Sequence, residues 1–220
     1  MKNIAYVKTE ELIYQLKHFK ADEIIDKYIK ESPSLKVHRP GEIIKNSFDH
    51  STYRAFHHES PRRVKYPQWR WYKKPDKLVK KLNSITTQED YDKFLYDVAK
   101  SLVKDWGNKN NLCEPTRMND GIALKIVNLI MKHFTYSSNC DKQKLECFLH
   151  VPWDSNTLKP LKQLWTLKPE IPINASQGFV KRLEIYKNLH DFISEITEQA
   201  GVPRIYYEFL KWDRPQQDKK

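Results

Sequence analysis

The amino-acid sequence predicts a mainly α-helical protein. Long stretches repeat apolar residues at the three-to-four spacing of a helix, and no two stretches alternate apolar and polar residues as paired strands do. The chain has 220 residues, which is enough for one domain of ordinary size over 1–220 or for two small domains that share a core.

The first helical pattern begins at Thr9, which is the predicted N-cap, and ends before Pro33. Asp22 marks a restart of the helix after a break. The composition then changes: residues 33–75 are rich in Pro, basic and aromatic residues, and their apolar residues show little periodicity. So long an irregular stretch is typical of a functional loop or an extended arm.

Within this arm, the run RRVKYPQWRWYKK from Arg62 to Lys74 interleaves cations with aromatic residues. The pattern suits phosphate contacts beside base stacking. It equally fits a segment whose aromatic rings pack on the core while its cations extend into solvent. The cations predicted to contact DNA are Arg62, Arg63, Lys65 and Arg70.

The remaining chain contains three longer helical patterns. A clear amphipathic helix runs over 88–106, with Thr86 or Thr87 as its cap and Gly107 at its close. A second helix follows a tight turn at 119–121, and a third runs over 176–201 with a terminal Gly. Pro203 opens the last segment, and a short helix or turn is expected after Asp154.

Composition points to a polyanionic partner. Lys and Arg number 39 against 28 Asp and Glu, a formal net charge of +11. A source organism whose proteins are generally rich in lysine would give the same excess of basic residues. The three cysteines, Cys113, Cys140 and Cys147, have no metal-site spacing, so we expect free thiols, no metal, no cofactor and a cytoplasmic location. The charged N-terminus predicts neither a signal peptide nor a membrane span.

Two residues stand out chemically. Lys125 follows Leu124 and precedes Ile126 and Val127, and burial of a lysine among apolar residues favours the neutral, nucleophilic amine. Spacing alone favours a blander interpretation, in which Lys125, Asn128 and Lys132 form a polar stripe that faces water. Asp154 follows a Val-Pro-Trp turn that would hold its carboxylate in one direction.

The sequence GIALKIVN, followed by VPWD with its Asp 29 residues after the Lys, resembles the helix-hairpin-helix DNA glycosylases, specifically the 8-oxoguanine branch. The resemblance implies a helical fold with its helix-hairpin-helix catalytic core in 76–220, and with N-terminal helices and the basic arm in 1–75. It implies that Lys125 attacks the sugar as the Schiff-base nucleophile. Asp154 would lie opposite, where it stabilises positive charge and moves the proton.

Other site residues follow from the same resemblance. Gly121 and Ala123 occupy hairpin positions that approach a DNA phosphate, although Ala123 and the acidic Asp120 depart from the family's Gly-rich pattern. Asn156 is expected to support a phosphate. The base pocket is expected to include Leu129, Trp153, Tyr206 and Trp212.

The implied activity is excision of a damaged or modified base from double-stranded DNA by a monomer, with β-lyase cleavage. An oxidised purine is the default substrate, and a hypermodified base stays open because Leu129 and the hairpin depart from the pattern.

Two other classes of function compete with the glycosylase. One is a non-catalytic DNA-binding protein on the same fold, and the other is an interaction module from a defence system or mobile element. His57, His58 and Glu59 could be taken for a metal or nuclease site. Adjacent His side chains point apart, and no further ligand is suitably spaced, so a surface loop is expected there.

Overall fold

The computed structural model describes residues 2–32, 35–37, 39–51, 66–106, 118–165, 169–175 and 179–217. Within these ranges the regular structure is helical throughout, with no strand, which confirms the predicted mainly α class. The α-helices are α1 (Lys2–Lys17), α2 (Ala21–Glu31), α3 (Pro40–Ser51), α4 (Pro75–Asn83), α5 (Gln88–Asp105), α6 (Asp120–Tyr136), α7 (Lys142–Leu145), α8 (Ser155–Leu161), α9 (Leu183–Ala200) and α10 (Ile205–Gln217). Short 3-10 helices, η3 (Tyr66–Gln68) and η4 (Glu146–Phe148), accompany them.

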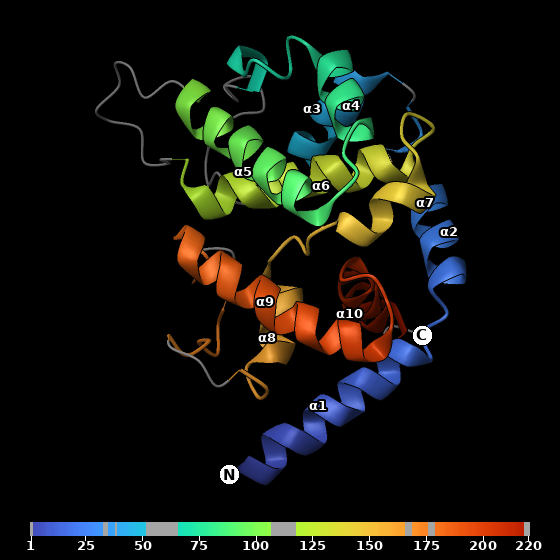
Figure 1. Ribbon diagram of the computed structural model, residues 1–220, viewed down its shortest axis with the longest axis vertical. Coiled ribbons are helices and arrows are strands. Elements are labelled where there is room, and N and C mark those ends of the chain that lie inside the picture. The colour runs from blue at the N-terminus through green and yellow to red at the C-terminus, as the bar shows by residue number, and fades with distance from the viewer. Residues whose placement is uncertain are drawn as a thin grey trace.

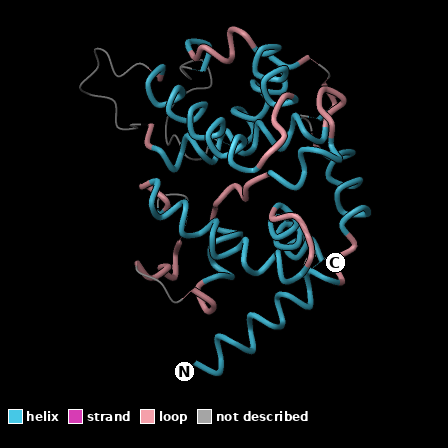
Figure 2. The backbone as a smooth tube through the Cα atoms, viewed as in Figure 1, coloured by secondary structure: helices cyan, strands magenta, loops and turns pink. Residues whose placement is uncertain are grey.

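The helices form two groups, one above the other (Figure 1). The upper group contains α3, α4, α5 and α6, and the lower group contains α1, α8, α9 and α10. Helix α2 runs along the side of both groups and packs against α10. The chain passes from the upper to the lower group through the loop that follows η4 and ends at Asp154 (Figure 2). Helix α6 lies at the boundary and contacts α9 below it.

Side-chain caps fix where the central helices begin. Thr87 caps α5 by accepting a hydrogen bond from the Asp90 N–H. Asn119 caps α6, with its side-chain oxygen 3.0 Å from the Ile122 nitrogen. The predicted turn at 119–121 is therefore wrong, because the second and third of these residues already belong to the first turn of α6. Helix α9 ends at Gly201, whose φ of 70° is the left-handed conformation that glycine adopts without strain.

The N-terminal quarter is more helical than predicted. Helix α1 begins well before Thr9, and the expected break falls between α1 and α2. Helix α3 lies inside the stretch predicted to be irregular, so that prediction is wrong for its residues. Ile43, Ile44 and Phe48 are buried at helical spacing, and α3 packs them against α6 and α4. Residues 52–65, including His57, His58 and Glu59, lie outside the described ranges.

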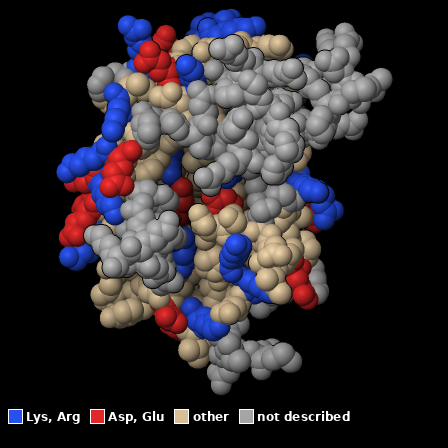
Figure 3. Space-filling model, turned by 180° about the vertical axis from the view of Figure 1, so that it is seen from behind, with Lys and Arg blue, Asp and Glu red and all other residues tan. Residues whose placement is uncertain are grey.

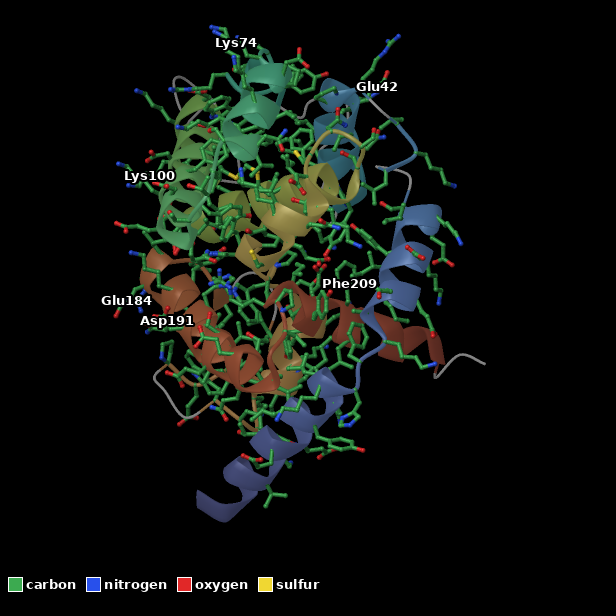
Figure 4. The ribbon with its side chains drawn as sticks, turned by 45° about the vertical axis from the view of Figure 1, so that its right-hand side comes forward. Glu42, Lys74, Lys100, Glu184, Asp191 and Phe209 are labelled. Atoms are coloured by element: carbon green, nitrogen blue, oxygen red, sulfur yellow. The ribbon has the colours of Figure 1, made fainter. Side chains whose placement is uncertain are left out.

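The described part of the basic, aromatic run packs its rings inward. Trp69 is fully buried, and its indole N–H donates to the Ser101 hydroxyl at 2.8 Å. The Trp71 ring meets the Phe94 ring edge-on at 6.2 Å. Lys74, at the end of the run, points outward (Figure 4). For these residues, core packing with solvent-facing cations is the interpretation that the structure supports.

No helix in the described ranges combines the length and the apolar character that a membrane crossing requires.

Candidate active site

Lys125 and Asp154 lie together at the boundary between the two helix groups. Lys125 is on the second turn of α6, and Asp154 is the N-cap of α8. The Lys125 Nζ is 3.7 Å from the Asp154 Oδ2, and the side chains are 14% and 34% exposed. The structure therefore brings together the two residues that the sequence analysis singled out, from separate helices and in a partly desolvated position.

The capping of α8 determines how Asp154 points. Its Oδ1 accepts the backbone N–H groups of Asn156 at 2.8 Å and Thr157 at 3.2 Å. The Thr157 hydroxyl in turn accepts the Asp154 backbone N–H at 2.9 Å, which completes a capping box. Because the helix end holds Oδ1, the other oxygen, Oδ2, is the one that faces Lys125.

The polar face of α6, formed by Lys125, Asn128 and Lys132, is directed at the lower group and not at water. These residues are spaced to share one side of a helix, and both Asn128 and Lys132 are buried. The interpretation of these three residues as a polar stripe that faces water is therefore wrong. Each residue contacts a different element of the lower group, namely Asp154 at α8, Tyr186 on α9 and Glu208 on α10.

The Lys132–Glu208 contact is a buried ion pair with an N–O distance of 2.7 Å. The Lys132 ammonium also lies 4.3 Å from the centre of the Tyr28 ring. Burial by itself lowers the pKa of Lys132, but the Glu208 carboxylate and Tyr28 outweigh it, and the pKa is raised. Burial raises the pKa of Glu208, and the charges of Lys132, Asp154 and Lys125 act on it as well. Glu208 is therefore an electrostatic neighbour of the Lys125–Asp154 pair.

Glu208 was not anticipated from the sequence. One of its oxygens, Oε2, is buried and has no hydrogen-bond partner among the described residues. The available signal was Lys132, which lies two turns after Lys125 and needs a carboxylate if it is buried. Sequence spacing could not identify that carboxylate, because it lies 76 residues further along the chain.

The hairpin residues are in contact with the protein itself. A Cβ on Gly121 would lie 1.4 Å from the Val180 carbonyl oxygen, so this glycine permits close packing of α6 on the segment that precedes α9. The absence of a side chain at this position is therefore required by the chain's own backbone. Ala123 is fully buried. Asn156 is exposed on the first turn of α8, where a phosphate could reach it.

Of the basic residues predicted to bind DNA, only Arg70 lies in the described ranges. Its Nε and Nη2 donate to the two oxygens of Asp105, at 2.8 and 3.0 Å. The hydrogen bond from Arg70 lowers the pKa of Asp105. Arg70 is thus already paired within the protein. Arg62, Arg63 and Lys65 lie outside the described residues.

The predicted base-pocket residues separate in the structure. Leu129 lies one turn after Lys125 on α6 and is buried. Trp153 is buried in the core. Its ring centre is 5.4 Å from that of His190 and 6.3 Å from that of Tyr207, so the ring is covered by the protein. Tyr206 donates to Glu146 at 3.3 Å and meets Phe19 edge-on. The Trp212 side chain lies outside what the structure describes.

The charged surface is seen from behind in Figure 3. Acidic side chains are visible in a hollow near the centre of this face, and Lys and Arg side chains are spread around it.

Phe209, which is labelled in Figure 4, lies on the inner side of α10, with its ring centre 5.3 Å from that of Tyr28 on α2.

Comparison of the chain with protein-family models, curated proteins and solved structures gives no match, so its function has to be inferred from its own residues and their geometry.

Proposed function

We propose that this protein is a DNA glycosylase of the helix-hairpin-helix type, which excises a damaged or modified base and cleaves the strand by β-lyase chemistry. The observation that carries the proposal is the Lys125–Asp154 pair, with an amine 3.7 Å from a carboxylate oxygen in a partly buried position. A protein that only binds DNA gains nothing from placing an amine there, because desolvating a charge pair costs free energy.

The proposed reaction begins with extrusion of the target nucleotide, which is least costly at a damaged or mispaired base. Asp154 accepts a proton from the Lys125 ammonium, and the free amine attacks C1′ of the sugar. The C1′–N bond breaks, and the base leaves with that electron pair and acquires a proton. The proton that the base acquires is the one held by Asp154, and the carboxylate restored in this way stabilises the positive charge that remains on the sugar and the amine.

Strand cleavage follows from the covalent intermediate. Loss of a proton from the amine at C1′ opens the sugar ring and gives an imine between Lys125 and C1′. Removal of a C2′ proton then expels the 3′ phosphate by β-elimination, and water releases the enzyme. The imine can be reduced by borohydride to a stable secondary amine, which makes the intermediate detectable.

Glu208 is proposed to influence the reaction through its charge, because it is an electrostatic neighbour of the Lys125–Asp154 pair. The formal net charge of +11 supports an association with DNA of any sequence.

Borohydride trapping tests the proposed function. Purified protein would be incubated with labelled duplexes that carry 8-oxoguanine, other oxidised bases, hypermodified bases or no lesion. We expect a covalent adduct on at least one modified duplex, and none with Lys125→Gln. Lys159→Gln, which removes an exposed lysine of α8, should form the adduct as the wild type does. Tight binding with no adduct on any duplex would instead support the non-catalytic DNA-binding protein.

A further inference from the structure

Four side chains from four separate segments form a continuous hydrogen-bonded chain beside the candidate active site. The Asp92 Oδ1 on α5 is 2.8 Å from the His150 Nε2. The His150 Nδ1 is 3.0 Å from the Tyr186 hydroxyl oxygen on α9. The same hydroxyl is 2.7 Å from the Asn128 side-chain nitrogen on α6. None of these residues has a place in the chemistry proposed above.

The direction of each hydrogen bond follows from the carboxylate end. Asp92 can only accept, so His150 Nε2 carries the proton that is donated to it. Burial, together with the nearby Arg204 charge, lowers the pKa of His150 well below its usual value, so the imidazole is neutral and its Nδ1 is an acceptor. Tyr186 therefore donates its proton to His150, and its oxygen accepts the N–H of Asn128. Each of the three hydrogen bonds therefore has one direction, and Asp92 Oδ1 also accepts the Gln88 side-chain N–H at 2.6 Å.

Packing holds the chain in place. His150, Tyr186 and Asn128 are each 1% exposed. The centre of the His150 ring is 4.1 Å from that of His190 and 5.5 Å from that of Tyr91. Buried side chains that are joined by directed hydrogen bonds have few arrangements available, which makes such chains suited to positioning other groups.

Two members of the chain, Asn128 and His150, adjoin the two proposed catalytic residues. Asn128 lies one turn after Lys125 on α6, and His150 lies four residues before Asp154 in the loop that leads to α8. A single hydroxyl, that of Tyr186, is bonded to both. Movement of α6 relative to that loop would break at least one of these two bonds.

We infer that the chain Asp92–His150–Tyr186–Asn128 is a positioning network that sets the distance between Lys125 and Asp154, with the Tyr186 hydroxyl as its junction. The inference rests on the proposed glycosylase activity. A displacement of about 1 Å in a reacting group can cost on the order of 100-fold in rate. The network therefore acts on the chemical step and leaves DNA binding unchanged.

Tyr186→Phe is the first test, with Tyr91→Phe as its matched control. Tyr91 is also a buried tyrosine against the His150 ring, but its hydroxyl has no hydrogen-bond partner among the described residues. The single-turnover rate constant of adduct formation should fall by about 10- to 100-fold in Tyr186→Phe and stay near the wild-type value in Tyr91→Phe. The amplitude of the reaction and the DNA affinity should be retained, whereas a merely unstable variant would lose amplitude.

Two replacements of His150 test its hydrogen bonds to Tyr186 and to Asp92 separately. They also test the inference if the Tyr186→Phe protein fails to fold. His150→Asn places an amide oxygen near the Nδ1 position and keeps an acceptor for Tyr186. His150→Gln places an amide nitrogen near the Nε2 position and keeps only the donor to Asp92. We expect His150→Asn to retain clearly more of the rate constant than His150→Gln.

The outcomes distinguish the inference from the proposed function. If the wild type forms no adduct on any duplex, the proposed function fails, and the inference fails with it. If the wild type forms the adduct and Tyr186→Phe reacts equally fast, the inference alone is overturned. Equal rates for His150→Asn and His150→Gln would likewise overturn it.

Discussion

The two carboxylate oxygens of Asp154 have different neighbours. Oδ1 accepts two backbone N–H groups at the start of α8, and Oδ2 faces the Lys125 amine at 3.7 Å. The residue thus serves both the local structure and the proposed chemistry, through separate atoms. This division makes the two contributions separable by substitution.

Asp154→Asn should abolish most activity and preserve the fold. An asparagine keeps the Oδ1 acceptor, and Asn is as good an N-cap as Asp, so unfolding in urea should change by less than about 1 kcal/mol. The NH2 group that replaces Oδ2 can neither accept a proton from Lys125 nor stabilise positive charge. Loss of such a group is expected to lower the rate of adduct formation by about 100- to 1000-fold. An Asp154→Asn protein that reacts at the wild-type rate would exclude the carboxylate from the reaction.

At the scale of the helices, α6 is packed so closely at its start that only glycine fits there. The ideal Cβ of Gly121 would lie 1.4 Å from a backbone oxygen, which cannot move aside as a flexible side chain could. By contrast, a Cβ at Gly41 in α3 would meet nothing nearer than a Pro75 carbon at 3.7 Å, an ordinary contact.

Gly121→Ala should therefore destabilise the protein by about 1–3 kcal/mol or more. Gly41→Ala is the control, and it should be neutral or stabilising by about 0.4–1 kcal/mol, because alanine loses less backbone entropy on folding. Urea unfolding of the two variants measures the difference. Equal stabilities would show that α6 does not pack on the Val180 backbone as described.

The pair between α6 and α10 gives a second prediction at this scale. Lys132→Met leaves the buried Glu208 carboxylate without its cation and should cost about 3–5 kcal/mol. The double variant Lys132→Met with Glu208→Leu removes both charges and should recover most of that loss. A double-mutant cycle from urea unfolding gives the coupling. Additive effects would mean that the two side chains do not interact.

The sequence was informative about elements whose signals are local. Helix α5 could be predicted because its apolar face and its cap at Thr87 lie within one continuous stretch of the sequence. Helix α3 was missed because Pro and Gly stand at its start, although Pro is well suited to a first helical turn. The Lys125–Asp154 pair could be anticipated from a spaced motif. The Lys132–Glu208 pair and the Val180 contact at Gly121 could not, because tertiary packing alone creates them.

For the whole molecule, the upper and lower helix groups meet through polar contacts as well as apolar ones. Lys125, Asn128 and Lys132 on α6 reach α8, α9 and α10 respectively. Behind them, His150 and His190 are buried, with their ring centres 4.1 Å apart and their planes tilted by 34°. Burial lowers the pKa of both imidazoles well below the usual value, and Arg204 adds to this, while Asp92 acts in the opposite direction on His190.

Stability should therefore fall as the solution is acidified. In the unfolded chain a histidine takes up a proton near pH 6.5, whereas in the folded protein these two remain neutral. Their contribution is fully present above about pH 6.5 and is lost below it, at about 1.4 kcal/mol per pH unit for each histidine. Urea unfolding between pH 5 and 8 measures the slope. His150→Asn should reduce it by about one histidine's share, and an unchanged slope would contradict the neutral, buried assignment.

Peptide mapping of the borohydride-reduced adduct would show which amine of the protein forms the covalent bond to DNA. The trapped complex would be digested with nuclease and protease, and the modified residue identified by tandem mass spectrometry. We predict that the sugar remnant is found on Lys125 alone. A remnant on another lysine or on the N-terminal amine, with Lys125 unmodified, would exclude Lys125 as the nucleophile.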